Sequence, residues 1–329
     1  MRSLIKHCRH GGGWEQAGEP GQACDGRGMI ERQADGGSVR APGLIRPLAP
    51  RDIPQVVAWA RAEGFCPGQG DVASFRHTDR QGLWVKELDQ RPIGCIAGVR
   101  YNASYGFIGL FLVDPAQRSR GHGLDLWRTA MGHLAALPCI GLEAAPERVE
   151  DYRGWGFRPA SPTRRWQVMA TGDERPIDPH DGLDLLQGKR LPRRAVQAYD
   201  ALREPSPRPH FLADWLGQEA GSVLALIDGQ GQCHGFGRIR PCLLRRGTGW
   251  RIGPLLADSP ALAERLLLGM LARHPGVVLI DVPGANPHGD PLMRRLGFQP
   301  LSTVLRMYRG EPPRVGLGDV YGLACLELG

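Results

Sequence analysis

The sequence is nearly devoid of lysine. Of its 41 basic residues only Lys6, Lys86 and Lys189 are lysines, and the remainder are arginines spread along the chain. The net charge of +7 would suit a nucleic-acid partner. However, basic runs do not exceed two residues, and aromatic side chains are not interleaved with them as a stacking surface would require. We therefore expect a solvated, arginine-rich surface and no nucleic-acid partner.

Long apolar runs and paired cysteines are also missing. No apolar segment approaches the length of a transmembrane helix, and the opening MRSLIKHCRH has no apolar stretch like that of a secretory signal. The eight cysteines are widely separated without a C-x-x-C pair, which argues against a zinc site. These absences favour a cytoplasmic protein with no metal and no membrane partner, and they leave its oligomeric state open.

Residues 1–43 show no hydrophobic period and are rich in glycine and polar residues, as in GGGWEQAGEPGQACDGRG. Such a segment buries too little apolar surface to offset the entropy lost on ordering. We expect a disordered extension before residue 44.

Ordered structure is predicted from Leu44 onward. Alternating and helical patterns follow one another in the order strand, helix, three strands, helix, strand, short helix and strand. The expected ranges are 44–47, 53–63, 82–88, 91–101, 105–113, 123–136, 140–145, 147–157 and 163–170. This order predicts an α/β fold whose mixed, mostly antiparallel sheet is flanked by helices.

The second half of the chain repeats the first. The segment IGPLLAD at 252–258 matches IGLFLVD at 108–114, and GFQPLSTVLR at 297–306 matches GFRPASPTRR at 156–165. Scattered matches in the same order predict two tandem copies of one fold.

These copies place a domain boundary near the middle of the chain. We assign 44–170 to the first domain and 171–329 to the second. The segment 170–182, ATGDERPIDPHDG, is polar and carries two prolines, so it predicts a linker rather than a shared core.

A basic, glycine-rich turn follows the strand predicted at 105–113. Its residues, Arg118 to Gly123, have the form Gln/Arg-x-x-Gly-x-Gly/Ala. Helix N-termini present unpaired N–H groups and the positive end of a dipole, and glycines let an anion approach the backbone. Between a strand and a helix, this pattern predicts a phosphate site to which Arg118 and Arg120 add charge. We expect His122 to face solvent.

These features resemble the GNAT superfamily of acyl-coenzyme A-dependent N-acetyltransferases. The glycine turn matches the superfamily's pyrophosphate-binding motif, and DYRGWGF at 151–157 is similar to its tyrosine-containing element. The segments EGFCPGQGD, RPIGCIAGVRY, RIGPLLAD and YGLACLELG further resemble tandem members with a YitH-type C-terminal domain. The likeness extends over residues 44–329.

The resemblance implies acetyl transfer from acetyl-CoA to an amine by direct attack. The implied cofactor-binding residues are Phe111, Leu112, Val113, Arg118, Ser119, Arg120, Gly121, His122 and Gly123. In this scheme the strand backbone pairs with the pantetheine arm, and an N–H near Leu112 stabilises the oxyanion. Tyr152 would protonate the departing thiolate.

The sequence leaves the general base open. The strand at 105–113 has no carboxylate, so Glu63, Asp71 and Glu143 are the candidates for a base or for binding a cationic acceptor. Carboxylates in such positions more often serve as a helix cap, a loop carboxylate or a solvated surface charge than as a base.

The second copy lacks the glycine turn and carries Met293 where the first copy has Tyr152. We expect it to bind no acetyl-CoA, and instead to wall the acceptor site or to stabilise the first domain.

Three functions remain open at this point. The leading one is an acetyltransferase for a small-molecule amine. The second is transfer of a larger acyl group, or transfer to a protein or peptide amine. The third is a non-catalytic CoA-binding sensor, which the lack of an obvious base favours and the presence of Tyr152 disfavours.

Overall fold

The computed structural model describes residues 43–175, 182–203, 207–314 and 316–329. The extension predicted at 1–43 therefore lies, apart from Gly43, outside the described residues. Within these ranges the chain forms thirteen β-strands and eight α-helices, and the predicted α/β class is confirmed.

The first half of the chain follows the predicted order of elements. Its strands are β1 (Leu44–Pro47), β2 (Leu83–Leu88), β3 (Arg91–Arg100), β4 (Tyr105–Val113), β5 (Cys139–Ala144) and β6 (Arg158–Ala170). Its α-helices are α1 (Ile53–Ala62), α2 (Asp71–Thr78), α3 (His122–His133) and α4 (Val149–Arg153).

Helix α2 was not predicted from the sequence. Its segment DVASFRHT buries only two large apolar side chains, Val72 and Phe75. One such pair, three residues apart, is too little periodicity to distinguish a helix from a loop.

The second half repeats this arrangement. Its strands are β7 (Asp184–Gln187), β8 (Ser222–Ile227), β9 (Cys233–Leu243), β10 (Thr248–Ala257), β11 (Gly276–Pro283), β12 (Gln299–Arg309) and β13 (Val320–Gly322). Its α-helices are α5 (Arg193–Ala201), α6 (Pro209–Gly217), α7 (Pro260–Leu271) and α8 (Gly289–Arg295).

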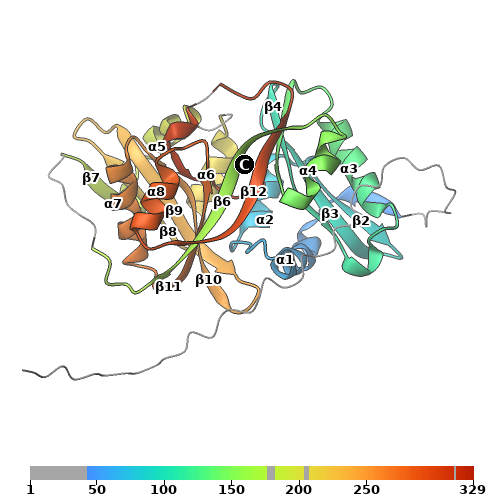
Figure 1. The fold of residues 1–329 in the computed structure, drawn as a ribbon, viewed down its shortest axis with the longest axis horizontal. Helices are drawn as coiled ribbons and strands as arrows, with labels where there is room; N and C mark the ends of the chain where they lie inside the picture. Colours follow the sequence, from blue (N-terminus) through green and yellow to red (C-terminus); the bar gives the residue numbers. More distant parts are fainter. Residues whose placement is uncertain (1–42, 176–181, 204–206, 315) are drawn as a thin grey trace, which may run out of the picture.

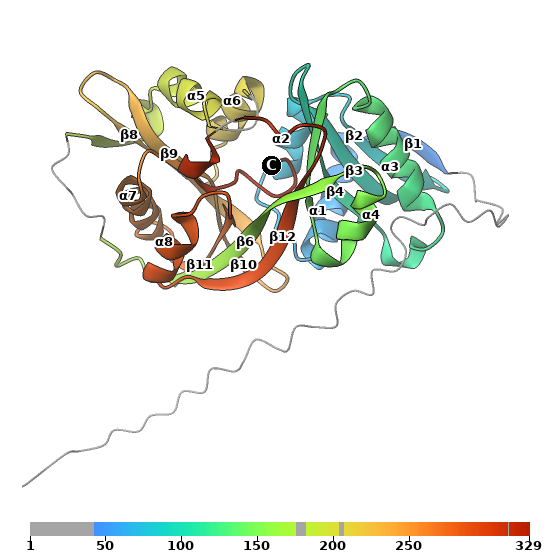
Figure 2. The same cartoon turned by 45° about the horizontal axis from the view of Figure 1, so that its top comes forward.

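The two halves share one sheet because they exchange their last strands. β12 of the second half pairs antiparallel with β5 of the first, and β6 of the first half pairs antiparallel with β11 of the second. β6 and β12 also pair with each other, and they cross side by side between the halves (Figures 1 and 2). The resulting strand order is β1-β2-β3-β4-β5-β12-β6-β11-β10-β9-β8-β7, with β13 on β10.

This exchange corrects the expectation of a linker without a shared core. Trp166 on β6 is fully buried, and it packs in a core cluster built mainly from second-half residues such as Leu255 and Ile280. The first half therefore supplies a strand and a core side chain to the second. The boundary between 44–170 and 171–329 stays a prediction, and part of the 170–182 segment lies outside the described residues.

The sheet of the first half has two faces covered by different helices. On the α3/α4 face, side chains of α3 and α4 pack with Ile108 and Leu142. On the α1/α2 face, side chains of α1 and α2 pack with Leu110 and Leu112. The second half joins this second face through Trp215, Ala324, Cys325 and Leu328.

Candidate functional site

The parallel strands β4 and β5 are neighbours only at their beginnings. Their ladder joins Tyr105–Ile108 to Cys139–Leu142 and ends there. Beyond it, β4 continues to Val113 beside β3, while β5 continues beside β12. We call this divergence the β4/β5 fork.

A bulge in β4 lies where the fork opens. Cys95 of β3 pairs with Leu112 and Ala97 with Gly109, so β4 uses one residue more than β3 over this stretch. Leu110 accommodates it with a φ of 47°. Bulges bend a strand and turn its backbone away from a neighbour. The edge of β4 that faces the fork therefore includes Phe111, Leu112 and Val113, the residues predicted to pair with pantetheine.

The glycine turn leads from this edge into α3. Gly121, the N-cap residue, has a φ of 78° and provides no side-chain cap, and Ser119 also has a positive φ of 60°. A helix N-terminus without a side-chain cap retains backbone donors and a positive dipole end for an anion.

The two arginines of the turn have different roles. The Arg118 guanidinium donates to the Val113 carbonyl oxygen at 3.0 Å and forms an ion pair with Glu63. It thus braces the turn against β4 and the end of α1. Arg120 is exposed and donates to the Gln117 amide oxygen at 3.3 Å, so its charge stays close to the turn.

One expectation for this region changes with the structure, and one candidate base acquires a partner. His122 is 3% exposed, so it does not face solvent as expected. α3 begins at His122, so this residue belongs to the helix and not to the loop in which it was expected. Glu63 is paired with Arg118, which gives it a bracing role, and its part as a base stays a prediction.

Tyr152 lies on the α3/α4 face, partly buried. Its ring packs on Trp127 with 5.2 Å between centroids and contacts Phe157 at 6.4 Å. No described residue hydrogen-bonds to its hydroxyl. Burial raises the pKa of Tyr152 to about 12, so the phenol stays protonated at neutral pH.

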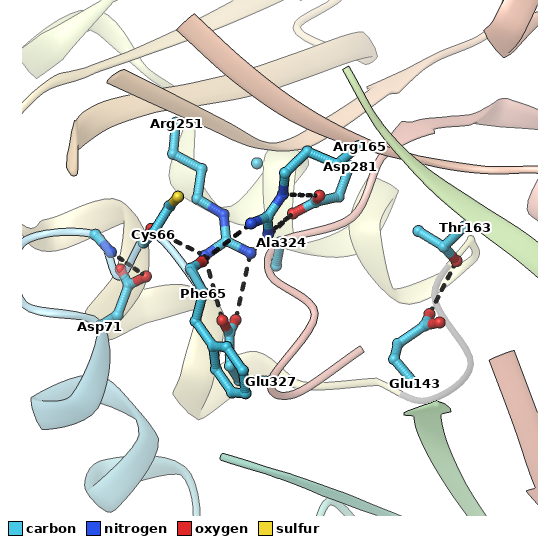
Figure 3. A network of polar contacts seen from close by, with 12 residues as sticks. Phe65, Cys66, Asp71, Glu143, Thr163, Arg165, Arg251, Asp281, Ala324 and Glu327 are labelled. Atoms are coloured by element: carbon cyan, nitrogen blue, oxygen red, sulfur yellow. Dashed lines mark hydrogen bonds and ion pairs between the residues drawn. The ribbon is translucent and has the colours of Figure 1, made fainter. Parts of the chain in front are cut away.

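Glu143 lies at the fork on the opposite face. It follows Leu142, the last β5 residue paired with β4, and alternation along the strand turns its side chain toward the α1/α2 face. Its Oε1 accepts from Arg306 Nε at 2.7 Å and from Thr163 Oγ1 at 3.0 Å, the latter drawn in Figure 3. Its Oε2 is buried without a partner among the described residues.

The environment of Glu143 changes its acidity. Burial raises the pKa of this carboxyl above its usual value, although the Arg306 guanidinium acts in the opposite direction. The hydroxyl of Tyr105 on β4 is likewise buried without a partner in the described chain, and it lies over Gly141 of β5. Two polar oxygens with unused hydrogen-bonding capacity therefore face the same side of the fork.

Asp71, the third base candidate, is held in a structural ion pair. Arg240 donates to its two carboxylate oxygens at 2.7 and 2.8 Å, and both side chains are buried. Asp71 also accepts from the Gly68 N–H at 2.9 Å. These bonds join α2 to β9 and engage both carboxylate oxygens.

A buried network, which the sequence analysis missed, connects the halves beside Asp71. Arg165 pairs with Asp281 at 2.7 Å, and Arg251 pairs with Asp281 at 2.8 Å and with Glu327 at 3.3 Å (Figure 3). Arg251 also donates to the carbonyl oxygens of Phe65 and Cys66. The available signal was charge inside apolar strands, as in RIGPLLAD and VVLIDVP.

The equivalent fork of the second half is filled by the chain itself. β10 and β11 pair only at Trp250–Ile252 and Val278–Ile280, and β13 then pairs with β10 at Leu255 and Leu256. Leu323 N–H donates to the Asp281 carbonyl oxygen of β11 at 2.9 Å. β13 and the residue after it thus lie between the diverging strands.

Two side chains complete this closure. Asn286 Nδ2 donates to the Val320 carbonyl oxygen at 3.1 Å. Ser259 caps α7 by accepting from the Leu262 N–H at 3.3 Å, so the helix N-terminus has an internal acceptor. Met293, in place of the tyrosine, is fully buried in the core.

The described ranges hold neither a metal centre nor a membrane-spanning helix. No cluster of histidine, cysteine, aspartate or glutamate there could hold a metal ion. Nor does any helix described here have the length and apolarity needed to cross a membrane.

Family models match both halves of the chain. Residues 53–157 match the Acetyltransferase (GNAT) family, and residues 196–322 match an Acetyltransferase (GNAT) domain. Together these matches cover more than half of the 329 residues.

A curated acyltransferase is also similar to this chain over most of its length. The holothin acyltransferase of a Pseudoalteromonas strain is 29% identical over 274 residues, which covers 82% of this chain and 89% of that protein.

Solved structures share the fold. A putative acetyltransferase from Pyrococcus horikoshii superposes with a TM-score of 0.72 at 23% identity, covering 91% of this chain and 99% of that one. A tandem GNAT protein from the clavulanic acid biosynthesis pathway gives a TM-score of 0.59 at 16% identity, covering 81% and 98%. With two matching domains, a diverging strand pair in each and an acyltransferase among its relatives, the chain belongs to the tandem-domain GNAT acetyltransferases, a family of acyltransferase enzymes.

Proposed function

We propose that the first half binds acetyl-CoA and transfers its acetyl group to a primary amine of a small molecule. The observation that carries this proposal is the contrast between the two forks. At the β4/β5 fork, no strand of the described chain pairs with β4 on its β5 side beyond Ile108, and β4 leads to a helix without a side-chain cap. The second fork is filled by β13, and its helix is capped by Ser259.

The residues of the first fork suit this cofactor. The backbone at Phe111, Leu112 and Val113 offers an edge along which an extended pantetheine arm can pair. The α3 N-terminus, with Ser119, Gly121 and Gly123 and the charge of Arg120, suits a pyrophosphate. When bound, acetyl-CoA supplies an activated acyl group as a thioester.

Glu143 and Tyr152 divide the proton transfers between them. As the amine nitrogen bonds to the acyl carbon and the carbon–sulfur bond breaks, Glu143 accepts the proton lost by the amine. Tyr152 gives its phenolic proton to the departing thiolate. They lie on opposite faces of the fork, so acceptor and cofactor approach from different sides. The raised pKa of Glu143 brings it nearer to that of an effective base.

The second half contributes the wall of the acceptor side. The carbonyl oxygen of Glu327 lies so close to Gly109, at the bulge, that a Cβ there would meet it at 1.9 Å. Tyr101 donates from its hydroxyl to the Leu328 carbonyl oxygen at 2.9 Å. The segment 323–329 thus lies against β4 on the α1/α2 face, which restricts that side and favours a small acceptor over a folded protein.

The decisive experiment measures thiol release from acetyl-CoA by the purified protein with a panel of small primary amines and a panel of peptides. We expect turnover with at least one small amine and none above background with peptides. Turnover with peptides alone would show that the acceptor is a peptide amine and not a small molecule. Binding of acetyl-CoA without turnover on either panel would favour a sensor.

Calorimetry tests the cofactor site separately. We expect one acetyl-CoA per chain, and loss of binding in Gly121→Glu, which places a carboxylate at the α3 N-terminus. Gly297→Glu is the matched control, because Gly297 has a similar φ of 79° and open space around it but lies in the second half. Two sites per chain, or equal affinity in all three proteins, would refute the assignment.

A further inference from the structure

Trp127 has a buried hydrogen-bond donor that packing within the described chain does not explain. It lies on α3 and is fully buried, and its indole Nε1 has no partner among the described residues. The two other fully buried tryptophans both donate: Trp166 Nε1 to Asp290 at 3.2 Å and Trp215 Nε1 to the Gly253 carbonyl oxygen at 3.0 Å. Leaving such a donor unpaired is unfavourable, and in native proteins such groups mark an absent partner or a functional role.

The position of Trp127 associates it with the fork. Its ring contacts Phe111 of the β4 edge at 5.9 Å and Tyr152 at 5.2 Å, with Trp155 and Phe157 completing the cluster. Trp127 therefore lies on the α3/α4 face, between the strand edge assigned to the pantetheine arm and the residue assigned as the acid. It stands one helical turn after Gly123 in the turn assigned to the pyrophosphate.

We propose that Trp127 is a cofactor-binding residue, whose indole N–H donates a hydrogen bond to a carbonyl oxygen of the acyl-pantetheine arm. The proposal rests on the assignment of acetyl-CoA to this fork. The chemistry is complementary, since the arm carries two amides and a thioester, and Trp127 supplies a donor for which the described residues offer no acceptor. Its ring contacts both Phe111 and Tyr152 and so holds them in a fixed relative position. The Trp127 N–H and the Tyr152 hydroxyl can then contact the same bound ligand.

The proposal predicts that loss of the Trp127 N–H removes a hydrogen bond from the complex with acetyl-CoA but costs the free protein no hydrogen bond to a described residue. The smaller phenyl ring of Trp127→Phe also reduces packing in both states, which the Trp155 control measures. Trp127→Phe should therefore bind acetyl-CoA about fivefold to tenfold more weakly, and the rise in melting temperature caused by acetyl-CoA should shrink. Trp155→Phe is the control, because Trp155 belongs to the same ring cluster and its nitrogen is not among the buried unpaired atoms.

The indole proton also gives a direct signal. In protein with ¹⁵N-labelled tryptophan, the indole cross-peak that disappears in Trp127→Phe identifies Trp127. Titration with acetyl-CoA should move this peak toward the hydrogen-bonded range and protect its proton from exchange. If Trp127→Phe does not fold, benzothienylalanine at position 127 keeps the ring volume and removes only the N–H, and calorimetry on that protein answers the same question.

The outcomes separate this inference from the proposed function. If the wild-type protein binds acetyl-CoA while its Trp127 signal stays unchanged and Trp127→Phe binds equally well, the inference is wrong and the function stands. If the wild-type protein binds no acetyl-CoA, both are overturned. Equal weakening in Trp127→Phe and Trp155→Phe would show that cluster packing, without a hydrogen bond, explains the effect.

Discussion

At the scale of single residues, Glu143 combines two properties that a purely structural carboxylate does not need. One oxygen is fixed by Arg306 and Thr163, which sets the orientation of the group, while the other is buried and has no hydrogen-bond partner in the described part of the chain. An anchored carboxylate with one unused oxygen is well suited to accept a proton from an incoming amine. Sequence alone placed Glu143 among three equal candidates, because neither Glu63 nor Asp71 reveals its arginine partner without the fold.

Replacing Glu143 tests its role as the base. Glu143→Gln should lower turnover by roughly 10²–10⁴-fold, the usual contribution of general-base catalysis, with little change in acetyl-CoA affinity. Since burial raises the pKa of Glu143, the wild-type rate should rise with pH along a limb centred above 4.5, the ordinary value. That limb should be absent from Glu143→Gln and retained in the control Glu147→Gln, whose side chain is exposed. An unchanged profile would remove Glu143 from the mechanism.

The role of Tyr152 can be tested by varying the thiol that leaves the thioester donor. Tyr152→Phe should reduce turnover with acetyl-CoA by a comparable factor, since the thiolate must then depart without an acid. A thioester donor with a more acidic thiol should recover much of the lost rate, because its thiolate needs no proton. A rate loss that is equal for both donors would indicate that the ring serves packing against Trp127.

At the scale of elements, the corresponding helices of the two halves differ at their N-termini, and the difference should appear in stability. Ser259→Ala removes the α7 cap and should lower the free energy of unfolding by about 1 kcal/mol. Acetyl-CoA affinity should not change, because α7 belongs to the closed fork. Urea unfolding measures the change in stability, and calorimetry measures the acetyl-CoA affinity. The control is Ser302→Ala, at an exposed position. Weaker acetyl-CoA binding in Ser259→Ala would place cofactor at the second fork.

The elements that the sequence predicted are those with strong local patterns. The apolar run at 105–113, the turn at 118–123 and the tyrosine-containing helix all occur where expected, and they form the first fork. The partner of each final strand could not be predicted, since GFRPASPTRR and GFQPLSTVLR carry almost the same pattern. Alternation determines which side chains face the core, but it does not say whether β6 or β12 pairs with β5.

At the scale of the whole molecule, the halves depend on each other. A fragment 44–170 would leave the edge of β5 without β12, β6 without β11, and Glu143 and Asp71 without their arginines. Removing one partner of a buried ion pair typically costs about 3–5 kcal/mol. We expect this fragment to be aggregated or unfolded by circular dichroism and size-exclusion chromatography, whereas 44–329 should be folded. A soluble, folded 44–170 that turns over the acceptor would contradict this dependence.

The strand exchange also has a consequence for biosynthesis. The first half is translated early, yet the strand that completes its sheet comes from residues 299–309. Until the ribosome has released those residues, the nascent chain carries an open β5 edge and a β6 strand awaiting its neighbours. Domain-by-domain cotranslational folding is therefore unavailable to this protein, and its nascent form is the state most exposed to strand-mediated misassembly and most in need of a holding chaperone.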